Sequence, residues 1–346
     1  MSITDYPPPE DGPEEEDLWF LPGPVEEEEE GFSPLHPPLP RAEATEGGQL
    51  ADWATAEAGQ AARLARVAGR LGALDDRLLR GPAGWRQRLA LTEAADLSWI
   101  TGGRITADRL GLWVAMRVSA LDEDGAALQR AAWVFRRLSG GPGPEAGLAS
   151  FLGRHETGGD LLLPERFAGW EMLIAEAAPL HPLTRAAMGF HLWPLAGIGR
   201  EGDLLEGAVI AARQAVAEGQ GGALFAPLAM GGPVPLRLGG PPEARLVRWL
   251  DGLDQALLTA ARLLDRVEAW QDRAREETAR LSGRTPGLLI AALRDWPFLS
   301  APMAETLTGA SRAAVQRNLT WMEKHALVDE VTGQGRYRFW RAATGS

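Results

Sequence analysis

The stretch from Ser300 to Arg341 reads SAPMAETLTGASRAAVQRNLTWMEKHALVDEVTGQGRYRFWR. Ser300 predicts the N-cap of a short helix over 301–308, because a serine hydroxyl can accept backbone N–H groups at a helix start. Gly309 suits the tight turn after that helix, since glycine readily takes a left-handed backbone. Ser311 then predicts the N-cap of a following helix. Two short helices joined by such a turn indicate a helix-turn-helix.

The helix after Ser311 is expected to have one apolar and one polar face. Val315, Leu319 and Met322 recur at i, i+4 and i+7 and therefore predict the buried face. The exposed side carries residue types that suit reading of base edges and contact with phosphates. The candidate contact residues on this helix are Ser311, Arg312, Ala313, Gln316, Arg317, Thr320 and Lys324.

The segment Glu330–Phe339, EVTGQGRYRF, predicts a β-hairpin with two glycines in its turn. Alternation along the second strand places Arg336 and Arg338 on one face and the two aromatic residues on the other. The arginines can bind backbone phosphate while the aromatic rings pack on the preceding helix. A helix-turn-helix followed by such a hairpin is typical of a winged helix.

A helix is also expected directly before this stretch. Thr285 is its predicted N-cap, with Pro286 in the first turn, where the missing N–H costs nothing. Its end is expected near Trp296 and Pro297. The predicted apolar face consists of Leu288, Leu289, Ala292 and Leu293.

Charge is distributed unevenly along the chain. From residue 283 onward there are eight Arg or Lys against five Asp or Glu, a net charge of +3. Residues 1–50 hold one Arg against fourteen acidic residues, a net charge of −13. A modestly basic module on an acidic chain favours selective, salt-sensitive binding of double-stranded DNA. Winged helices also serve as protein-docking modules, and that alternative stays open.

Composition narrows the class of protein further. With 346 residues, 45% of them hydrophobic, the chain can form one large or two modest cores. The absence of cysteine excludes disulfides and thiolate metal sites. No signal peptide and no membrane-spanning run are recognisable, so we expect a cytoplasmic protein. None of the five histidines lies in a metal-ligand spacing, and no metal or cofactor is predicted.

Three regions are expected along the chain. Residues 1–48 are rich in Pro, Glu and Gly and predict a disordered acidic tail. Residues 49–282 show helical periodicity, and residues 283–346 form the winged helix. In the helical region, apolar seams run through Leu64, Val67, Leu71, Leu74 and Leu78, and helices are expected over 89–99, 106–121, 124–138, 164–177, 182–193 and 204–218.

A long helix is expected before the winged helix, and no strand is expected outside the wing. Gly252 within this helix weakens the expectation of a continuous rod. Its seam can form intramolecular core or a dimer interface, and both alternatives stay open. The heptad-like seam consists of Leu246, Leu250, Leu253, Leu257, Ala260, Leu264 and Val267.

The order of segments over roughly residues 50–346 resembles the Fic family, whose enzymes transfer AMP from ATP to protein hydroxyls. Glu93–Gly102, EAADLSWITG, is similar to the segment that holds the family's inhibitory glutamate, with Thr101 in the place of that glutamate. His181–Ala187, HPLTRAA, looks like the helix that leads into the family's catalytic loop. The resemblance implies a helical bundle, often followed by a winged helix.

The catalytic loop itself departs from the family. The corresponding segment here is Trp193–Arg200, WPLAGIGR. Aligned with a one-residue gap, it places Trp193 where the general-base histidine belongs; aligned on Arg200 without a gap, the preceding Leu192 takes that place. Neither side chain can remove a proton from a target hydroxyl. His191 lies just outside both registers, so a shifted base stays open. The resemblance therefore implies an inactive site, and no catalytic residue is predicted.

The C-terminus also resembles a family of uncharacterised bacterial, often plasmid-encoded, helix-turn-helix proteins, which share a segment like Glu330–Trp340. We expect a mainly α protein: a Fic-like but inactive bundle with a C-terminal winged helix-turn-helix and a small β wing. Its expected function is sequence-specific DNA binding as a transcriptional regulator or plasmid-associated factor, as a homodimer through the bundle. The alternatives are a divergent nucleotidyl transferase that uses Arg200 for phosphate, or a protein-docking adaptor.

Overall fold

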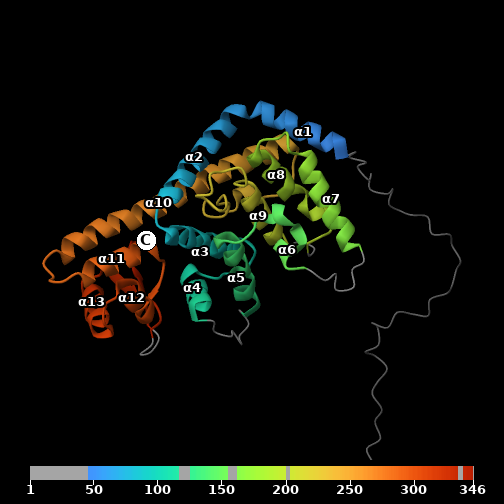
Figure 1. Cartoon of the computed structure of the whole chain (residues 1–346). Coiled ribbons are helices and arrows are strands. Elements are labelled where there is room, and N and C mark those ends of the chain that lie inside the picture. Colours follow the sequence, from blue (N-terminus) through green and yellow to red (C-terminus); the bar gives the residue numbers. More distant parts are fainter. Residues whose placement is uncertain (1–45, 117–124, 155–161, 200–202, 334–337, 346) are drawn as a thin grey trace, which may run out of the picture. The chain divides into compact units, whose positions relative to one another are not determined.

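A computed structural model describes residues 46–116, 125–154, 162–199, 203–333 and 338–345. The chain divides into two units, Met1–Ala44 and Thr45–Ser346, and only the second contains described residues. The described secondary structure is mainly α-helical, with one small antiparallel sheet near the C-terminus (Figure 1). The expected fold class, mainly α with a small β wing, is confirmed.

The predicted tail, residues 1–48, lies outside the described residues except at its end. Helix α1 begins at Glu46, so the last three residues assigned to the tail belong to a helix instead. The helices of the first region are α1 (Glu46–Gly59), α2 (Ala61–Arg80), α3 (Ala83–Ile100), α4 (Ala107–Met116), α5 (Gly125–Ser139), α6 (Leu148–Leu152), α7 (Leu163–Glu176), α8 (Pro182–Leu192), α9 (Leu205–Gln214) and α10 (Pro242–Thr278), with short 3-10 turns η2 (Pro144–Ala146), η3 (Trp193–Leu195) and η4 (Val234–Leu236).

Helix α10 is continuous over its whole length. The heptad-like seam predicted for it is buried throughout, because α1, α2 and α8 pack along it. The seam is therefore intramolecular core and is not available as a dimer interface. Gly252, which weakened the expectation of a continuous rod, does not interrupt the helix. A Cβ atom at this position would lie 2.3 Å from the Cδ of Pro235, so glycine is needed there to let η4 pack against α10.

The other predicted helices occur with shifted ends. Helix α4 ends at Met116, and the expected continuation to residue 121 lies outside the described residues. Helix α9 ends at Gln214 and not at Glu218, because the following N–H groups, such as that of Ala217, bond to carbonyls only three residues back. The seam residues from Leu64 to Leu78 in α2 are buried, as predicted.

The long segment between α9 and α10 contains little regular structure, yet much of it is buried. Phe225, Leu228 and Met230 contribute to the large hydrophobic core of the bundle. The carboxylate of Glu93 on α3 accepts the backbone N–H groups of Leu228 (2.8 Å), Ala229 (2.9 Å) and Met230 (3.2 Å). Burial raises the pKa of Glu93 to about 7. This carboxylate therefore fixes a loop that has few backbone partners of its own.

The C-terminal module comprises α11 (Thr285–Asp295), β1 (Leu299–Ser300), α12 (Ala301–Thr308), α13 (Arg312–Lys324), β2 (Val328–Glu330) and β3 (Phe339–Ala342). Its sheet has the order β1-β3-β2, and both pairs are antiparallel. Strand β1 corrects the expectation that no strand lies outside the wing. Its two residues are too few to show an alternation, and they pair with Phe339 and Trp340.

Helix α11 differs from its prediction in two details. Arg284 and not Thr285 occupies the N-cap, and no side chain caps this helix. Leu288 is 37% exposed, whereas Ile290 is 1% exposed, so the buried face is rotated relative to the predicted one. The helix ends before Trp296, as expected.

A second hydrophobic core fills the C-terminal module and includes Trp270 and Ala274 from the end of α10. The indole N–H of Trp270 donates to the carbonyl of Leu327 at 2.6 Å. From the bundle, the buried guanidinium of Arg88 donates to the carbonyls of Leu293 (3.0 Å) and Trp296 (2.8 Å). The last turns of α10 thus pack as part of the C-terminal module, although the sequence boundary was placed after residue 282.

Candidate nucleic-acid interface

Local chemistry builds the turn between α12 and α13. The hydroxyl of Ser300 accepts the N–H of Met303 at 3.3 Å, and that of Ser311 accepts the N–H of Ala314 at 3.4 Å. Gly309 has a φ of 61°, in the left-handed region that favours glycine. Both predicted caps and the predicted turn are thus present. They bring α12 and α13 together as a helix-turn-helix (Figure 1).

Helix α13 buries its apolar face in the second core. Val315, Leu319 and Met322 are fully buried, as their spacing predicted. This packing fixes the rotation of the helix about its axis. The polar residues between them must therefore point away from the module.

The side of α13 away from the core carries the predicted contact residues. Ser311, Arg312, Ala313, Arg317, Thr320 and Lys324 are exposed, and Gln316 is half-buried. Within the described part of the chain, the side chains of Arg312, Arg317 and Lys324 form no hydrogen bond or ion pair. Cationic groups with no partner inside the protein are available to an external anion.

Of the two arginines predicted in the wing, only Arg338 lies in the described residues. Arg336 lies in the segment 334–337, outside the described residues. Arg338 is described, and its guanidinium forms an ion pair with Glu323 of α13 at 3.0 Å. The same group lies over the ring of Trp340, 4.9 Å from its centroid. Arg338 is therefore engaged within the module, although the hairpin pattern predicted a phosphate contact.

One cation near α13 was not predicted. Arg280, in the turn after α10, lies 5.7 Å above the ring of Trp321, which also stacks on His325 at 3.7 Å. Arg280 is exposed. It falls just before the predicted start of the winged helix, so the charge count from residue 283 onward left it out. An aromatic residue on a polar helix face was the available signal for such a partner.

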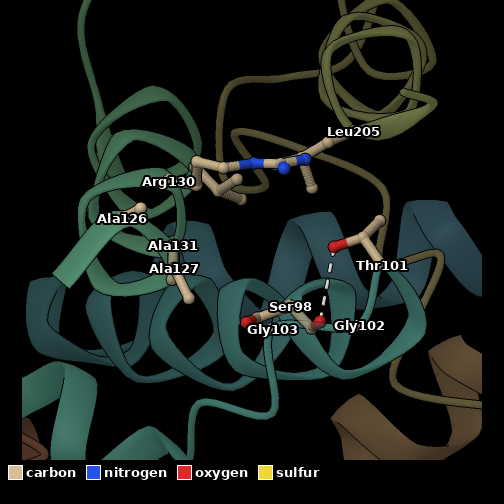
Figure 2. Close-up of a pocket in the computed structure, with 10 residues that line it drawn as sticks. Ser98, Thr101, Gly102, Gly103, Ala126, Ala127, Arg130, Ala131 and Leu205 are labelled. Carbon is tan, nitrogen blue, oxygen red and sulfur yellow. Dashed lines mark hydrogen bonds between the residues drawn. The ribbon is translucent and has the colours of Figure 1, made fainter. Parts of the chain in front are cut away.

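The bundle also holds the segments that carry the Fic resemblance. A cavity of about 260 Å³ is lined by Ser98 and Thr101 of the first segment, by Arg130 of α5 and by Leu205 at the start of α9. Figure 2 shows how these side chains are arranged. The hydroxyl of Thr101 donates to the carbonyls of Leu97 and Ser98. Arg130 forms an ion pair with Asp203 at 2.9 Å. The cavity is smaller than the roughly 300–1,000 Å³ of typical ligand pockets.

The described residues in and around the segment 193–200 have structural roles. Trp193 is buried and packs edge-on against Trp170, and Ile198 is buried. Arg200 lies outside the described residues. His181 caps α8, since its Nδ1 accepts the N–H of Leu183 at 3.1 Å.

His191, the open candidate for a shifted base, is 5% exposed and stacks on Trp53. Burial first, and then the neighbouring charges of Arg245 and Arg248, lower the pKa of His191 to about 3. An imidazole in this position is a core residue that a protein substrate cannot reach.

The described residues contain no group of three or more histidine or carboxylate side chains that could hold a metal ion. None of the helices in these ranges is long and apolar enough to cross a membrane.

The sequence matches no model of a known protein family and no curated protein. The functional proposal therefore rests on the geometry of α12 and α13.

Proposed function

We propose that this protein binds double-stranded DNA in a sequence-specific manner through α13. The observation that carries the proposal is the pair Arg312 and Arg317 on the second helix of a helix-turn-helix, which are exposed and have no partner among the described residues. In this class of motif, the N-terminal half of the second helix enters the major groove and contacts base edges. Arginine is well suited to that role, because its guanidinium can donate two parallel bonds to guanine.

The neighbouring groups have separate roles in the proposal. Gln316 contacts base edges together with the two arginines. Ser311, Ala313 and Thr320 are further contact residues on the same side of α13. Lys324 and Arg336 bind backbone phosphates, and Arg280 adds a further cation at the same module. Arg338 supports α13 through Glu323 and contacts DNA only when that ion pair opens.

The bundle serves as a scaffold in this proposal. We infer a catalytically inactive, Fic-like domain in a cytoplasmic regulator or plasmid-associated factor. A single winged helix covers one half-site, so tight binding favours a homodimer. Because the α10 seam is buried, such a dimer must use another surface of the bundle.

A protein-docking role is the second candidate, and one observation favours it. Leu288 of α11 and Leu307 of α12 are 37% and 46% exposed, so the module presents some apolar surface. Neither side chain belongs to α13, which carries Arg312, Arg317 and Lys324. We therefore rank DNA binding first.

The test begins with selection of binding sites from a random duplex pool by the full chain. The dissociation constant of a selected site is then measured at fixed salt for Arg312→Ala and Arg317→Ala. Each variant is expected to weaken binding by about 1–3 kcal/mol, because each removes a base or phosphate contact. Arg275→Ala is the control, since Arg275 is an exposed arginine of α10 whose recorded contact is a 3.8 Å ion pair with Asp272.

The outcomes separate the proposed classes. Failure to enrich any sequence, or unchanged affinity of both α13 variants, would overturn the DNA-binding proposal. Genome-wide footprinting of the tagged protein without discrete sites would favour the docking adaptor. Labelling of a target protein by radioactive ATP would instead show a nucleotidyl transferase.

A further inference from the structure

A cleft of about 510 Å³ lies between the bundle and the C-terminal module. Leu91 of α3 and Leu263 of α10 line it from the bundle, and Phe298 lines it from the segment before β1. Its volume falls within the roughly 300–1,000 Å³ that is usual for small-molecule sites. It is about twice as large as the cavity beside Thr101, for which about 260 Å³ is found. The cleft thus has the size and the apolar surface that a small organic ligand needs.

Two cationic side chains of the cleft donate to backbone carbonyls and form no ion pair in the described ranges. Arg273 is exposed, and its guanidinium donates to the backbone carbonyl of Ala343 at 2.7 Å. Arg88 donates to backbone carbonyls at the end of α11. Burial lowers the pKa of Arg88 to about 10, so the group is still charged at neutral pH. The negative charge of Asp295 acts on Arg88, whereas the charge of Arg273 is neutralised by no ion pair in the described ranges.

The remaining charged groups of the cleft limit the charge of a ligand. Arg341 forms ion pairs with Asp108 at 2.6 Å and with Asp329 at 3.3 Å. Three arginines and two aspartates line the cleft, so its net charge is +1. The two aspartates would repel a diphosphate or triphosphate. A ligand with a single negative charge fits this balance.

We infer that the cleft binds a small organic monocarboxylate. The carboxylate pairs with the guanidinium of Arg273, whose planar geometry matches two carboxylate oxygens. The hydrocarbon part packs against Leu263 and Phe298. This site is separate from the DNA-contacting face of α13 and goes beyond the proposed function.

The test uses 2-naphthoate as the probe and 2-naphthamide as its uncharged analogue. Titration calorimetry on the full chain, without DNA, is expected to show at least tenfold tighter binding of the carboxylate. Arg273→Gln should weaken binding of 2-naphthoate about tenfold or more, because a charge-assisted hydrogen bond is lost. Arg275→Gln, two residues along α10 and outside the cleft, should bind like the unchanged protein.

A second variant tests by steric blocking whether the ligand occupies the cleft. Leu263→Trp fills part of the cleft and should abolish binding, while circular dichroism and thermal unfolding confirm that the variant is folded. Equal affinity for the carboxylate and the amide, no binding of either, or full binding by both variants would overturn the inference. Because DNA is absent from these titrations, their result is independent of whether α13 binds DNA.

Discussion

The helical bundle and α13 use their charged side chains in opposite ways. Two charged groups of the bundle are matched within the chain: Glu93 accepts three backbone N–H groups, and Arg154 pairs with Glu206 at 2.6 Å. On α13, Arg312 and Arg317 are exposed, with no such partner among the described residues. Charges paired within the chain thus contribute to the fold, whereas charges without such a partner are available for binding. Removing a matched charge should cost stability, whereas removing an unmatched one should cost binding.

The largest expected effect is that of Glu93→Ala. The variant leaves three buried N–H groups, those of Leu228, Ala229 and Met230, without an acceptor. Each unsatisfied buried group costs about 1–3 kcal/mol, so we expect a loss of about 3–5 kcal/mol in the free energy of unfolding. Urea denaturation measures this loss. Glu165→Ala on α7 is the control, because Glu165 is exposed and should change stability by less than about 0.5 kcal/mol.

An unchanged denaturation midpoint for Glu93→Ala would contradict the expectation that removing a matched charge costs stability. It would mean that the loop over residues 219–241 holds itself in place. The bundle would then contain a buried carboxylate without a structural role.

The pH dependence of stability tests the same carboxylate without removing its hydrogen bonds to the loop. Burial raises the pKa of Glu93 from 4.5 to about 7, so the folded state holds the proton more tightly than the unfolded state. Its stabilising contribution is therefore complete below about pH 4.5 and is lost as the pH rises to 7. The shift corresponds to at most about 3 kcal/mol.

The measurement is the free energy of unfolding between pH 4.5 and 8 for the wild type and for Glu93→Gln, which cannot titrate. The difference between the two proteins removes the parallel contribution of Asp96, whose pKa burial raises to about 6. It also removes the opposite contribution of His191, whose pKa is lowered to about 3. A difference that is constant with pH would show that Glu93 is ionised throughout.

Arg88→Leu tests a matched charge that joins the bundle to the C-terminal module. The variant leaves the carbonyls of Leu293 and Trp296 without their donor, and we expect a loss of about 2 kcal/mol in stability. Affinity of the folded protein for a selected DNA site should change less than twofold. A strong loss of DNA affinity with unchanged stability would show instead that Arg88 contributes to DNA binding and not to the fold.

The helix-turn-helix could be predicted from the sequence because its determinants are local. The caps Ser300 and Ser311 act within three residues, and the left-handed turn needs only Gly309. The burial of Val315 and Leu319 follows from helical periodicity alone. The exposed positions of Arg312 and Arg317 follow from the same periodicity.

The features that the sequence did not reveal depend on partners far along the chain. Glu93 meets its loop across more than 130 residues, and only the fold shows which backbone groups it binds. Gly252 was read as a weak point of a helix because its neighbour Pro235 is not visible in a helical pattern. Arg338 was assigned to DNA because strand alternation gives its face but not its partner Glu323.

The smallest expected effect concerns the ion pair between Arg338 and Glu323, which joins a predicted DNA contact to a partner within the chain. The side chains of Arg338 and Glu323 are 29% and 35% exposed, so breaking the pair should cost less than about 1 kcal/mol of stability. If Arg338 is a matched charge, Arg338→Ala should weaken DNA binding much less than Arg317→Ala does. Glu323→Gln should strengthen DNA binding about two- to fivefold, because it releases a cation and removes a negative charge from α13. Competition binding to one selected duplex at two salt concentrations compares all three variants, and the gain for Glu323→Gln should shrink at the higher salt. A loss for Arg338→Ala as large as that for Arg317→Ala would instead place Arg338 among the groups that contact DNA, as the hairpin sequence alone had indicated.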